Sequence, residues 1–539
     1  MTQQTADRDL TSEPPPPPPS GRPTGRSDGS HARNFSSGFL VKLAFVAIFD
    51  AGALYGILAA VAVRSWVIAG FLVLAMIAVN WAYFSKRALP AKYLVPGLIF
   101  LFVYVIFAAV YTAFVAFTNY GDGHNSDKAD AVAAILAQNE VRVEGSQAYA
   151  LTVLSRGDQL GFAIVQDGEA QVGSAEFPLE PADDATIEGD VVTAVPTWDV
   201  LNFAAIAQQQ EAVVALRVQV SGDPNDGALR TNDGSTGYVY ESTMVYDEAA
   251  DTMTNTATGT VYTPDDHGNF RSAEGEVLTP GWRVNVGFEN FTRAFQDDRL
   301  RGPFLQIFVW TFVFAFLSVA TTFVVGLFLA VVFNDPRVKG RRYYRALMIL
   351  PYAFPAFLAG LVWRGMLNQS FGFVNEVLLG GASVPWLDSP TLAKVSLLMV
   401  NLWLGFPYMF LVCTGALQSI PGDVIESARM DGAGSWRVQR SIVMPLLMVS
   451  VAPLLVASFA FNFNNFTLIY TLTGGGPNFP GAPITVGATD ILISTVYAIA
   501  FESGTRQYGF ASALSIMIFI IVGAISWWGF RRTRSLEEL

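Results

Sequence analysis

The chain has 539 residues, of which 52% are hydrophobic and only 14% are charged, and its mean hydropathy is +0.38. A soluble protein could not bury so much apolar surface, so this composition excludes that class and indicates a polytopic membrane protein. The formal charge of −12 is unevenly placed, because residues 121–301 hold 30 of the 45 acidic residues but only 10 of the 33 basic ones. The sequence therefore predicts an acidic soluble insert on a basic membrane body, and it shows no pattern typical of nucleic-acid binding.

Residue types that carry catalysis or bind metals are sparse. The single cysteine, Cys413, excludes a disulfide within the chain. The three histidines, His31, His124 and His267, are far apart in the sequence and form no metal-binding pattern. No G-x-x-x-x-G-K-[ST] or H-E-x-x-H segment is present. The one G-x-S-x-G match, Gly25–Gly29, lies beside a proline run and not at the strand-to-helix turn that a nucleophile elbow needs. We therefore expect no catalytic residues, no metal site and no cofactor in this chain.

The N-terminal residues 1–37 include six consecutive prolines, Pro14–Pro19, followed by a segment rich in Gly, Ser and Arg. Such a composition cannot build a hydrophobic core. It predicts a disordered tail that is partly polyproline II.

Eight apolar segments are long enough to cross a bilayer, which takes about 20 residues of α-helix. They are Phe39–Val63, Trp66–Phe84, Tyr93–Phe117, Phe304–Phe333, Arg345–Leu367, Leu392–Leu417, Ile442–Phe463 and Phe510–Trp528. The first two are almost contiguous, so we expect them to form a tight hairpin. A further apolar run, Ile491–Ala500, is too short to span and is interpreted as a re-entrant or surface helix on the outside.

Basic residues between the spans predict their orientation. Clusters lie between spans two and three, four and five, and six and seven, and after span eight; they are Lys86, Arg87, Lys92, Arg337, Lys339, Arg341, Arg342, Arg345, Arg429, Arg437, Arg440, Arg531, Arg532 and Arg534. All of these clusters face the cytoplasm if both termini are cytoplasmic. The acidic insert then lies outside.

The insert, residues 121–300, has a different pattern from the spans. Asp130–Asn139 is predicted as a short helix, and Tyr149–Ser155, Leu160–Gln166, Val213–Val220 and Gly237–Tyr246 alternate in the way that predicts strands. Asp, Gly, Asn and Pro between them are typical of turns. A small β-rich domain is therefore expected, and its acidic residues are interpreted as a solvated face because no EF-hand loop is present.

Polar side chains inside the spans are candidates for a binding site, because they are costly in lipid and usually face the bundle interior. In span seven, Ser458, Asn462 and Asn465 recur at spacings of four and three, so they share one helical face, with Phe461 beside it. Amides bond sugar hydroxyls, and aromatic rings cover the apolar face of a pyranose. Amides also link helices within membranes, and the spacing alone leaves both interpretations open.

Span six carries a second polar set, which comprises Asn401, Trp403, Leu404, Gly405, Pro407 and Tyr408. Gly405 and Pro407 are expected to interrupt this helix near mid-membrane, and broken helices often mark transport sites. A plain packing kink explains the same residues equally well. In span one, Asp50 pairs with a neighbouring helix, stays protonated, or relays protons.

The loop between spans six and seven is polar although very apolar segments flank it. Its residues Glu426, Ser427, Ala428, Asp431 and Gly432, followed by Ile442 and Pro445, resemble the EAA loop of ABC importer permeases. The resemblance implies that Glu426–Gly432 forms a coupling helix that docks in a cleft of an ATPase subunit. Ser427 and Met444 depart from the family pattern, which has another small residue and a leucine at these positions.

Further segments resemble the larger permease subunits of maltose/maltodextrin ABC importers: Phe117–Tyr120, Trp403–Met409, Ala428–Gly434, Ala457–Phe466 and Thr473–Pro477. The resemblance implies substrate contacts at Asn401, Leu404, Gly405, Tyr408, Ser458, Phe461, Asn462 and Asn465, whereas Phe406 stands where relatives often have Tyr. It also implies partners: a second, smaller permease subunit, an ATPase subunit dimer that binds ATP and Mg, and an extracytoplasmic sugar-binding protein. The insert matches this family poorly, so its partner contacts are not assigned to residues.

Composition and resemblance together predict an all-α polytopic membrane protein with eight transmembrane helices of ABC importer permease type and a β-rich extracytoplasmic insert domain. The expected divisions are a cytoplasmic tail (1–37), helices one to three (38–120), the insert (121–300) and a permease core (301–535) with a coupling loop (419–441). We expect a nonenzymatic subunit in the cell membrane that imports α-glucosides. A proton-coupled secondary sugar transporter that uses Asp50, and a membrane sensor with the insert as receptor, are the alternatives.

Overall fold

A computed structural model describes residues 37–62, 65–85, 89–143, 145–335, 337–502, 504 and 506–537 of the chain. The chain divides into two units, Met1–Phe107 and Ala108–Leu539. The proline-rich tail predicted over residues 1–37 lies outside the described residues apart from Ser37.

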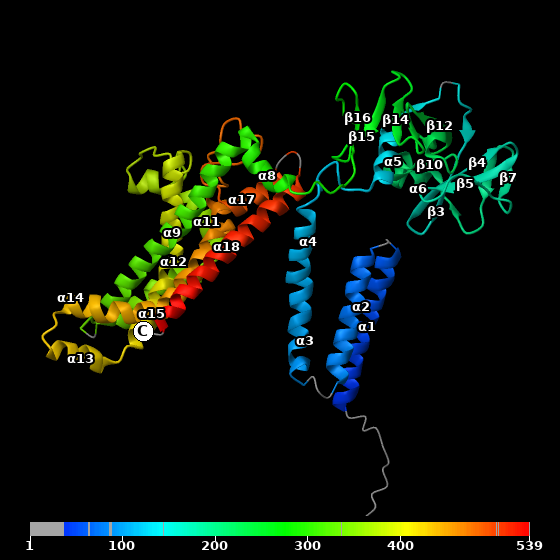
Figure 1. Ribbon diagram of the computed structural model, residues 1–539. Helices are drawn as coiled ribbons and strands as arrows, with labels where there is room; N and C mark the ends of the chain where they lie inside the picture. The colour runs from blue at the N-terminus through cyan, green and yellow to red at the C-terminus, as the bar shows by residue number, and fades with distance from the viewer. Residues whose placement is uncertain are drawn as a thin grey trace, which may run out of the picture. The chain divides into compact units, whose positions relative to one another are not determined.

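The first unit is helical, with α1 at Ser37–Ala62, α2 at Trp66–Phe84, α3 at Leu89–Leu101 and the π-helical segment η1 at Phe102–Ile106. The helices α1 and α2 lie side by side as the expected hairpin (Figure 1). Across this hairpin, Asn80 Nδ2 donates a hydrogen bond of 2.8 Å to Asp50 Oδ1. Asp50 is therefore paired with a neighbouring helix, which was one of the interpretations of this carboxylate.

The insert follows α4 (Phe107–Val115) and is rich in strands, which confirms the β-rich prediction. Its helical segments are α5 Lys128–Gln138, α6 Phe203–Gln208, α7 Gln210–Ala215 and the 3₁₀ turn η2 Pro224–Asp226. Its strands are β1 Glu140–Arg142, β2 Tyr149–Ala150, β3 Thr152–Arg156, β4 Gln159–Gln166, β5 Glu169–Ser174, β6 Glu180–Pro181, β7 Thr186–Glu188, β8 Val191–Ala194, β9 Asp199–Val200, β10 Val218–Gln219, β11 Ala228–Thr231, β12 Thr236–Ser242, β13 Met244–Asp247, β14 Thr252–Asn255, β15 Val261–Pro264 and β16 Phe270–Ser272. The strand orders are β1-β12-β11-β10 with β2 beside β12, β13-β14-β15-β16, β6-β5-β4-β3-β9, and β7-β8.

Alternation of apolar and polar residues explains how these sheets close over small cores. Ile135 of α5 packs with Met253 and Phe270 of the β13–β16 sheet, and all three are fully buried. The strand predicted at Val213–Val220 is wrong in its first half, which is α7, because one face of this helix packs Val213 into a core. The strand predicted at Gly237–Tyr246 is divided into β12 and β13, which belong to different sheets.

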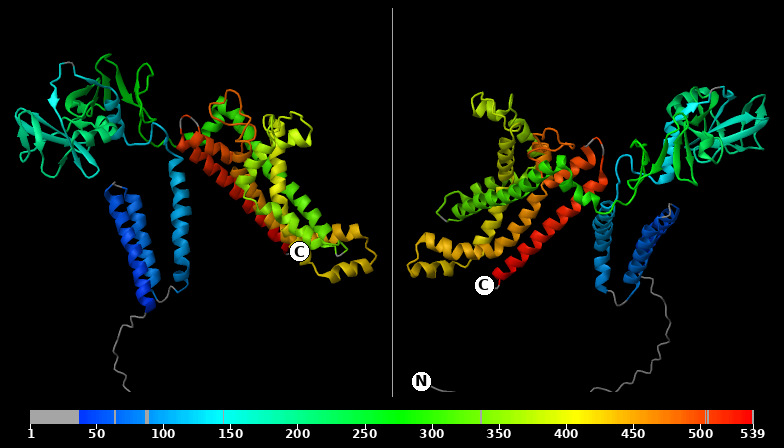
Figure 2. Two further views of the ribbon diagram at one scale, coloured as in Figure 1. Left: turned by 180° about the vertical axis from the view of Figure 1, so that it is seen from behind. Right: turned by 45° about the horizontal axis from the view of Figure 1, so that its top comes forward.

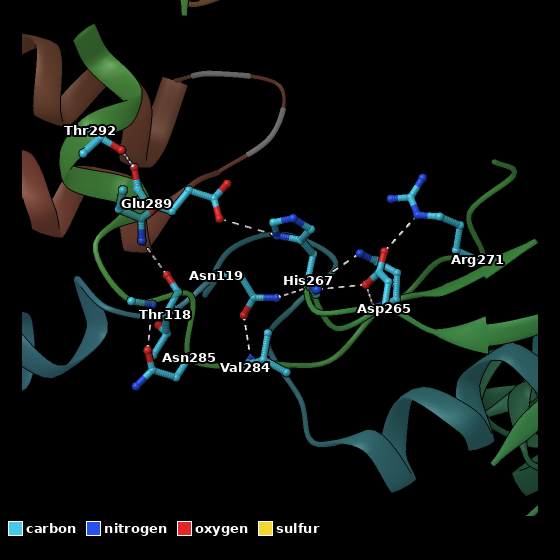
Figure 3. A network of polar contacts seen from close by, with 12 residues as sticks. Thr118, Asn119, Asp265, His267, Arg271, Val284, Asn285, Glu289 and Thr292 are labelled. Atoms are coloured by element: carbon cyan, nitrogen blue, oxygen red, sulfur yellow. Dashed lines mark hydrogen bonds and ion pairs between the residues drawn. The ribbon is translucent and has the colours of Figure 1, made fainter. Parts of the chain in front are cut away.

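Asparagine side chains hold the linkers that join the insert to the permease core (Figure 3). Asn119 Nδ2 donates to the carbonyls of His267 (2.7 Å) and Trp282 (3.1 Å). Asn119 Oδ1 accepts a bond of 2.8 Å from the N–H of Val284. The buried Asn290 side chain donates to two carbonyls of the first linker, at 2.9 and 2.8 Å. The segment Phe117–Tyr120 thus ties the start of the insert to its return.

The permease core begins with α8 Glu289–Gln296 and α9 Asp298–Asn334, followed by α10 Arg341–Ile349, η3 Leu350–Ala353, α11 Ala356–Met366, η4 Val374–Leu378 and α12 Pro390–Gln418. It continues with α13 Gly422–Met430, α14 Ser435–Val438, η5 Gln439–Val443, α15 Met444–Phe463, α16 Phe466–Leu472, α17 Leu492–Tyr497, η6 Ala498–Glu502 and α18 Tyr508–Glu537. The helices α9, α12, α15 and α18 run side by side (Figures 1 and 2).

Among the described residues, six helices are long and apolar enough to cross a membrane: Ser37–Ala62, Tyr93–Val115, Asp298–Asn334, Pro390–Gln418, Ser435–Phe463 and Tyr508–Thr533. The bent pair Arg341–Ala353 and Ala356–Met366 makes a seventh if it is one span. The predicted second span gives only a shorter apolar helix, Ile68–Phe84, and the predicted run Ile491–Ala500 is likewise a short one, Leu492–Glu502. The helical polytopic fold is therefore confirmed, whereas the count of eight spans is not.

The predicted fifth span, Arg345–Leu367, is wrong as a single straight helix. The chain bends by 90° between η3 and α11. The bend has a local cause, because Pro355 lacks an N–H and holds the preceding Phe354 in an extended conformation with ψ of 129°.

The helices α9 and α12 pack very closely where they cross. At Gly326 of α9, a Cβ atom would lie 2.7 Å from both Met409 Cβ and Phe410 N of α12. Only glycine lets the two backbones approach this closely. Phe314 and Leu397 are fully buried along the same pair of helices.

Candidate functional site

One cavity of the permease core is lined by every substrate-contact residue predicted from the sequence. It has a volume of about 430 Å³, and we call it the amide cavity. Its predicted lining residues are Asn401, Leu404, Gly405, Tyr408, Ser458, Phe461, Asn462 and Asn465. They come from α12, from the end of α15 and from Asn465 at the start of α16, so folding brings together two polar sets that are separate in the sequence.

Three amides form a hydrogen-bonded row in the wall of the amide cavity. Asn401 Nδ2 donates to Asn462 Oδ1 at 3.1 Å, and Asn465 Nδ2 donates to Asn401 Oδ1 at 3.2 Å. Asn462 Nδ2 donates to the carbonyl of Ser458 at 2.9 Å. Asn401 and Asn462 are only 7% and 8% exposed. The same amides therefore line the cavity and link α12 to α15, so the two interpretations left open by their spacing are compatible.

The interruption expected at Gly405 and Pro407 is wrong, because α12 is one helix from Pro390 to Gln418. Pro407 removes only one donor from the helix, and packing on α9 keeps the helix continuous around it. The chain instead breaks between α15 and α16, where the side chain of Asn465 caps α16 by accepting from the N–H of Leu468. This break turns the Asn465 side chain toward Asn401.

Part of the cavity was missed by the sequence reasoning, namely Thr322 of α9 and Pro351, Tyr352, Phe354 and Ala356 around η3. The rings of Tyr352 and Tyr408 stack with centroids 6.4 Å apart and an angle of 22° between their planes. The available signal was the pair of prolines in Leu350–Pro355, which disfavours a straight span there. Because this segment was predicted to be one straight span, its residues were not expected to line the cavity.

The chemistry of the amide cavity suits a neutral, hydroxyl-rich ligand. Every residue that lines it is uncharged. Amides and tyrosine hydroxyls provide donors and acceptors, and Phe461, which is 70% exposed, offers a ring face. A charged ligand would find no counter-ion in this lining and would lose its hydration.

The predicted coupling residues lie on a compact helical hairpin formed by α13 and α14. The side chains of Glu426, Ser427 and Asp431 are exposed, and Ala428 is half-buried. Gly432 has φ of +82°, a left-handed conformation that favours glycine at the end of a helix.

Two backbone bonds close the end of α13 in the pattern of a Schellman motif. They are Ala433 N–H to the carbonyl of Ala428 and Gly432 N–H to the carbonyl of Arg429, both 3.0 Å long. Met430, the last residue of α13, is 88% exposed, and Trp436 of α14 is 75% exposed. The hairpin lies at the same end of the core helices as the C-terminal end of α18 (Figures 1 and 2). It is therefore a rigid, protruding element with apolar side chains free for contact.

Comparison with known proteins supports this description. Residues 322–529 match the family model described as the inner membrane component of binding-protein-dependent transport systems. Residues 99–176 match the N-terminal model of the transmembrane subunit in such ABC transporters. The chain is similar to the maltose/maltodextrin transport system permease protein MalF of Vibrio vulnificus, with 36% identity over 84% of this chain and 87% of the relative. It is 35% identical to MalF of Escherichia coli K12, over 84% of this chain and 89% of the relative.

A solved bacterial ABC transporter involved in import of the acidic polysaccharide alginate is also similar, with a TM-score of 0.40 and 22% identity over 46% of this chain and 84% of that chain. The relatives are transport subunits, which confirms that the chain is not an enzyme and is a multi-pass inner-membrane protein. The family decides against the secondary transporter and the sensor. With 36% of the aligned residues identical over 84% of this chain and 87% of the relative, the chain belongs to the MalF family of ABC importer permease subunits.

Proposed function

We propose that this permease forms the translocation path for maltose and maltodextrin-type α-glucosides in an ATP-driven importer. The observation that carries the proposal is the amide cavity, in which all eight predicted contact residues meet in an uncharged lining. The names of the relatives, which are maltose/maltodextrin permeases, support the choice of substrate.

The division of labour within the cavity follows from its side chains. The row Asn401, Asn462 and Asn465 offers amide groups to sugar hydroxyls, and the stacked Tyr352 of η3 and Tyr408 of α12 add hydroxyls. Phe461 would cover the apolar face of a pyranose ring.

Movement of the sugar is coupled to ATP through the α13–α14 hairpin. Glu426 pairs with a basic residue in the cleft of a separate ATPase subunit, which binds ATP and Mg, while Gly432 permits the turn that presents the helix. Closure of the ATPase dimer then moves the hairpin, and with it α12 and α15, so that the cavity opens alternately to either side. A second, smaller permease subunit and an extracytoplasmic sugar-binding protein complete the importer. Both termini are cytoplasmic in this arrangement.

The test is uptake by the complete importer reconstituted in liposomes. We expect uptake of labelled maltose that needs internal ATP and external binding protein and that a protonophore does not stop. Asn462→Ala should raise the KM about tenfold, the effect of one lost polar contact of about 1.4 kcal/mol. Asn464→Ala is the matched control, because Asn464 lies two residues away but is exposed and does not line the cavity. Equal uptake kinetics in both variants would contradict the proposed site.

A further inference from the structure

A second cavity of about 350 Å³ lies in the same core, and we call it the outer cavity. Its polar lining residues are Arg364, Asn368, Gln369, Asp388, Thr473 and Asn478. Arg364 lies in the last turn of α11, and Thr473 begins the segment Thr473–Pro477. The outer cavity gives both a common location.

The two cavities follow one another along α16. Asn465 and Leu468 line the amide cavity, whereas Leu472 and Thr473 line the outer cavity. Leu468 and Leu472 are one helical turn apart, which is about 6 Å along the axis. Because α15 leads from the coupling hairpin to α16, the outer cavity is the one farther along the chain from that hairpin.

The outer cavity differs from the amide cavity in its chemistry. It contains one cation, Arg364, and one anion, Asp388, so its lining has no net charge. Within the part of the chain that the structure describes, neither side chain makes a hydrogen bond or ion pair, so their donors and acceptors are available to a ligand. Leu387 and Pro477, which are both half-buried, add apolar surface. Charged and amide groups beside apolar patches suit a neutral molecule that carries both hydroxyls and C–H faces.

One wall of the outer cavity is held in place by a buried amide. Asn375 is 0% exposed, and its Nδ2 donates to the carbonyls of Gln369 (3.0 Å) and Val384 (2.9 Å). Its Oδ1 accepts from Trp386 Nε1 at 2.9 Å. These bonds fix the loops that carry Gln369 and Asp388, so little conformational freedom is lost when a ligand binds.

The opposite wall is the turn Thr473–Pro477, which the segment around Thr489 holds. Thr489 Oγ1 donates to the carbonyl of Gly476 at 2.6 Å, and the N–H of Thr489 donates to the carbonyl of Gly475 at 3.0 Å. The N–H of Ala488 donates to the carbonyl of Pro477 at 2.9 Å. Both walls are therefore preformed, as expected of a binding site rather than a gap between loops.

We propose that the outer cavity is a second saccharide site, which binds a neutral oligosaccharide on its way to the amide cavity. This inference rests on the proposed function of the chain as a sugar permease. It assigns Arg364 and Asp388 to hydroxyl binding, since both present unpartnered charged groups in a preformed, neutral cavity.

Protection of a single introduced thiol tests the inference in the complete importer. Cys413 is the one cysteine of the chain and is fully buried, so Asn478→Cys provides one exposed thiol in the outer cavity. Labelling of this chain by a small impermeant maleimide is followed by mass, with maltotriose as the probe and sorbitol at equal osmolarity as the control solute. Saturating maltotriose should slow labelling roughly fivefold, because a sugar bound in the pocket would block the reagent's access to the thiol.

Ser370→Cys is the matched control, because Ser370 is exposed nearby but does not line the cavity, and its labelling should not change. Arg364→Gln should raise the maltotriose concentration for half protection about tenfold, as expected for a lost charge-assisted bond. Gln369→Cys replaces Asn478→Cys if that variant does not assemble.

Labelling rates that maltotriose leaves unchanged, or that fall equally at Ser370→Cys, would overturn the outer site. The proposed function is judged separately by wild-type uptake of maltotriose in the same liposomes. Asn462→Ala, which alters the amide cavity, should reduce uptake and leave the protection at position 478 intact.

Discussion

The amide row in the wall of the amide cavity predicts that a single substitution affects both stability and sugar affinity. Asn401→Leu keeps the branched shape and the number of non-hydrogen side-chain atoms but removes both hydrogen bonds that join α12 to Asn462 and Asn465, at 3.1 and 3.2 Å. Hydrogen bonds between membrane helices contribute about 0.6–1.7 kcal/mol each. The substitution should therefore lower the free energy of unfolding by about 1–3 kcal/mol. The freed amides of Asn462 and Asn465 also lose their orientation toward the cavity, so the KM for maltose should rise.

The assay combines thermal unfolding of the purified importer with uptake normalised to folded protein. Asn464→Leu is the control, since its exposed side chain makes only one weak bond, of 3.4 Å to the carbonyl of Ala460. Lower stability with an unchanged KM would mean that the amides are structural links alone. An unchanged unfolding midpoint for Asn401→Leu would refute the reasoning, because the hydrogen bonds would then contribute nothing to helix association.

Three further predictions concern other parts of the permease core. Glu426→Lys or Gly432→Asp should abolish ATP-coupled uptake while the membrane subunits still co-purify, and normal uptake by both variants would contradict the coupling role. Gly326→Ala places a Cβ atom 2.7 Å from α12 and should lower stability by about 1–3 kcal/mol, whereas Gly302→Ala in the same helix meets nothing within 4 Å and should not lower the melting temperature. Burial raises the pKa of Asp490, which lies between the spans α15 and α18, from 3.8 to about 6. As pH rises, the carboxyl of Asp490 ionises in the unfolded chain before it ionises in the folded protein. Its contribution to the free energy of unfolding, about 3 kcal/mol, is therefore complete below about pH 4 and is lost by about pH 6. Asp490→Asn should flatten stability over that range, and an unchanged slope would refute the assignment.

Local patterns in the sequence predicted much of the candidate site. The spacing of Ser458, Asn462 and Asn465 places them on one face of any helix, whatever surrounds it. The sequence did not reveal that Asn401 would lie between two of these amides, because that contact joins residues 61 positions apart. Tyr352 was missed for a related reason, since composition alone cannot show that a hydrophobic segment bends by 90°.

The errors in the insert have the same origin. Val213–Val220 is apolar enough for a strand, yet its first half is helical because Val213 packs into a core built by distant residues. The division between β12 and β13 depends on which sheet each half joins, and strand pairing is not encoded within one strand.

The sequence by itself determined the membrane class, the acidic insert and the polar stretch Glu426–Gly432, because each depends only on composition and short-range spacing. Only the tertiary structure decided that two polar helices share one uncharged cavity, and that Arg364 and Thr473 belong to a second one. The physical reason is that a cavity exists only where packed helices leave space. The packing depends on contacts such as that of Gly326 with Met409, which join residues far apart in the chain.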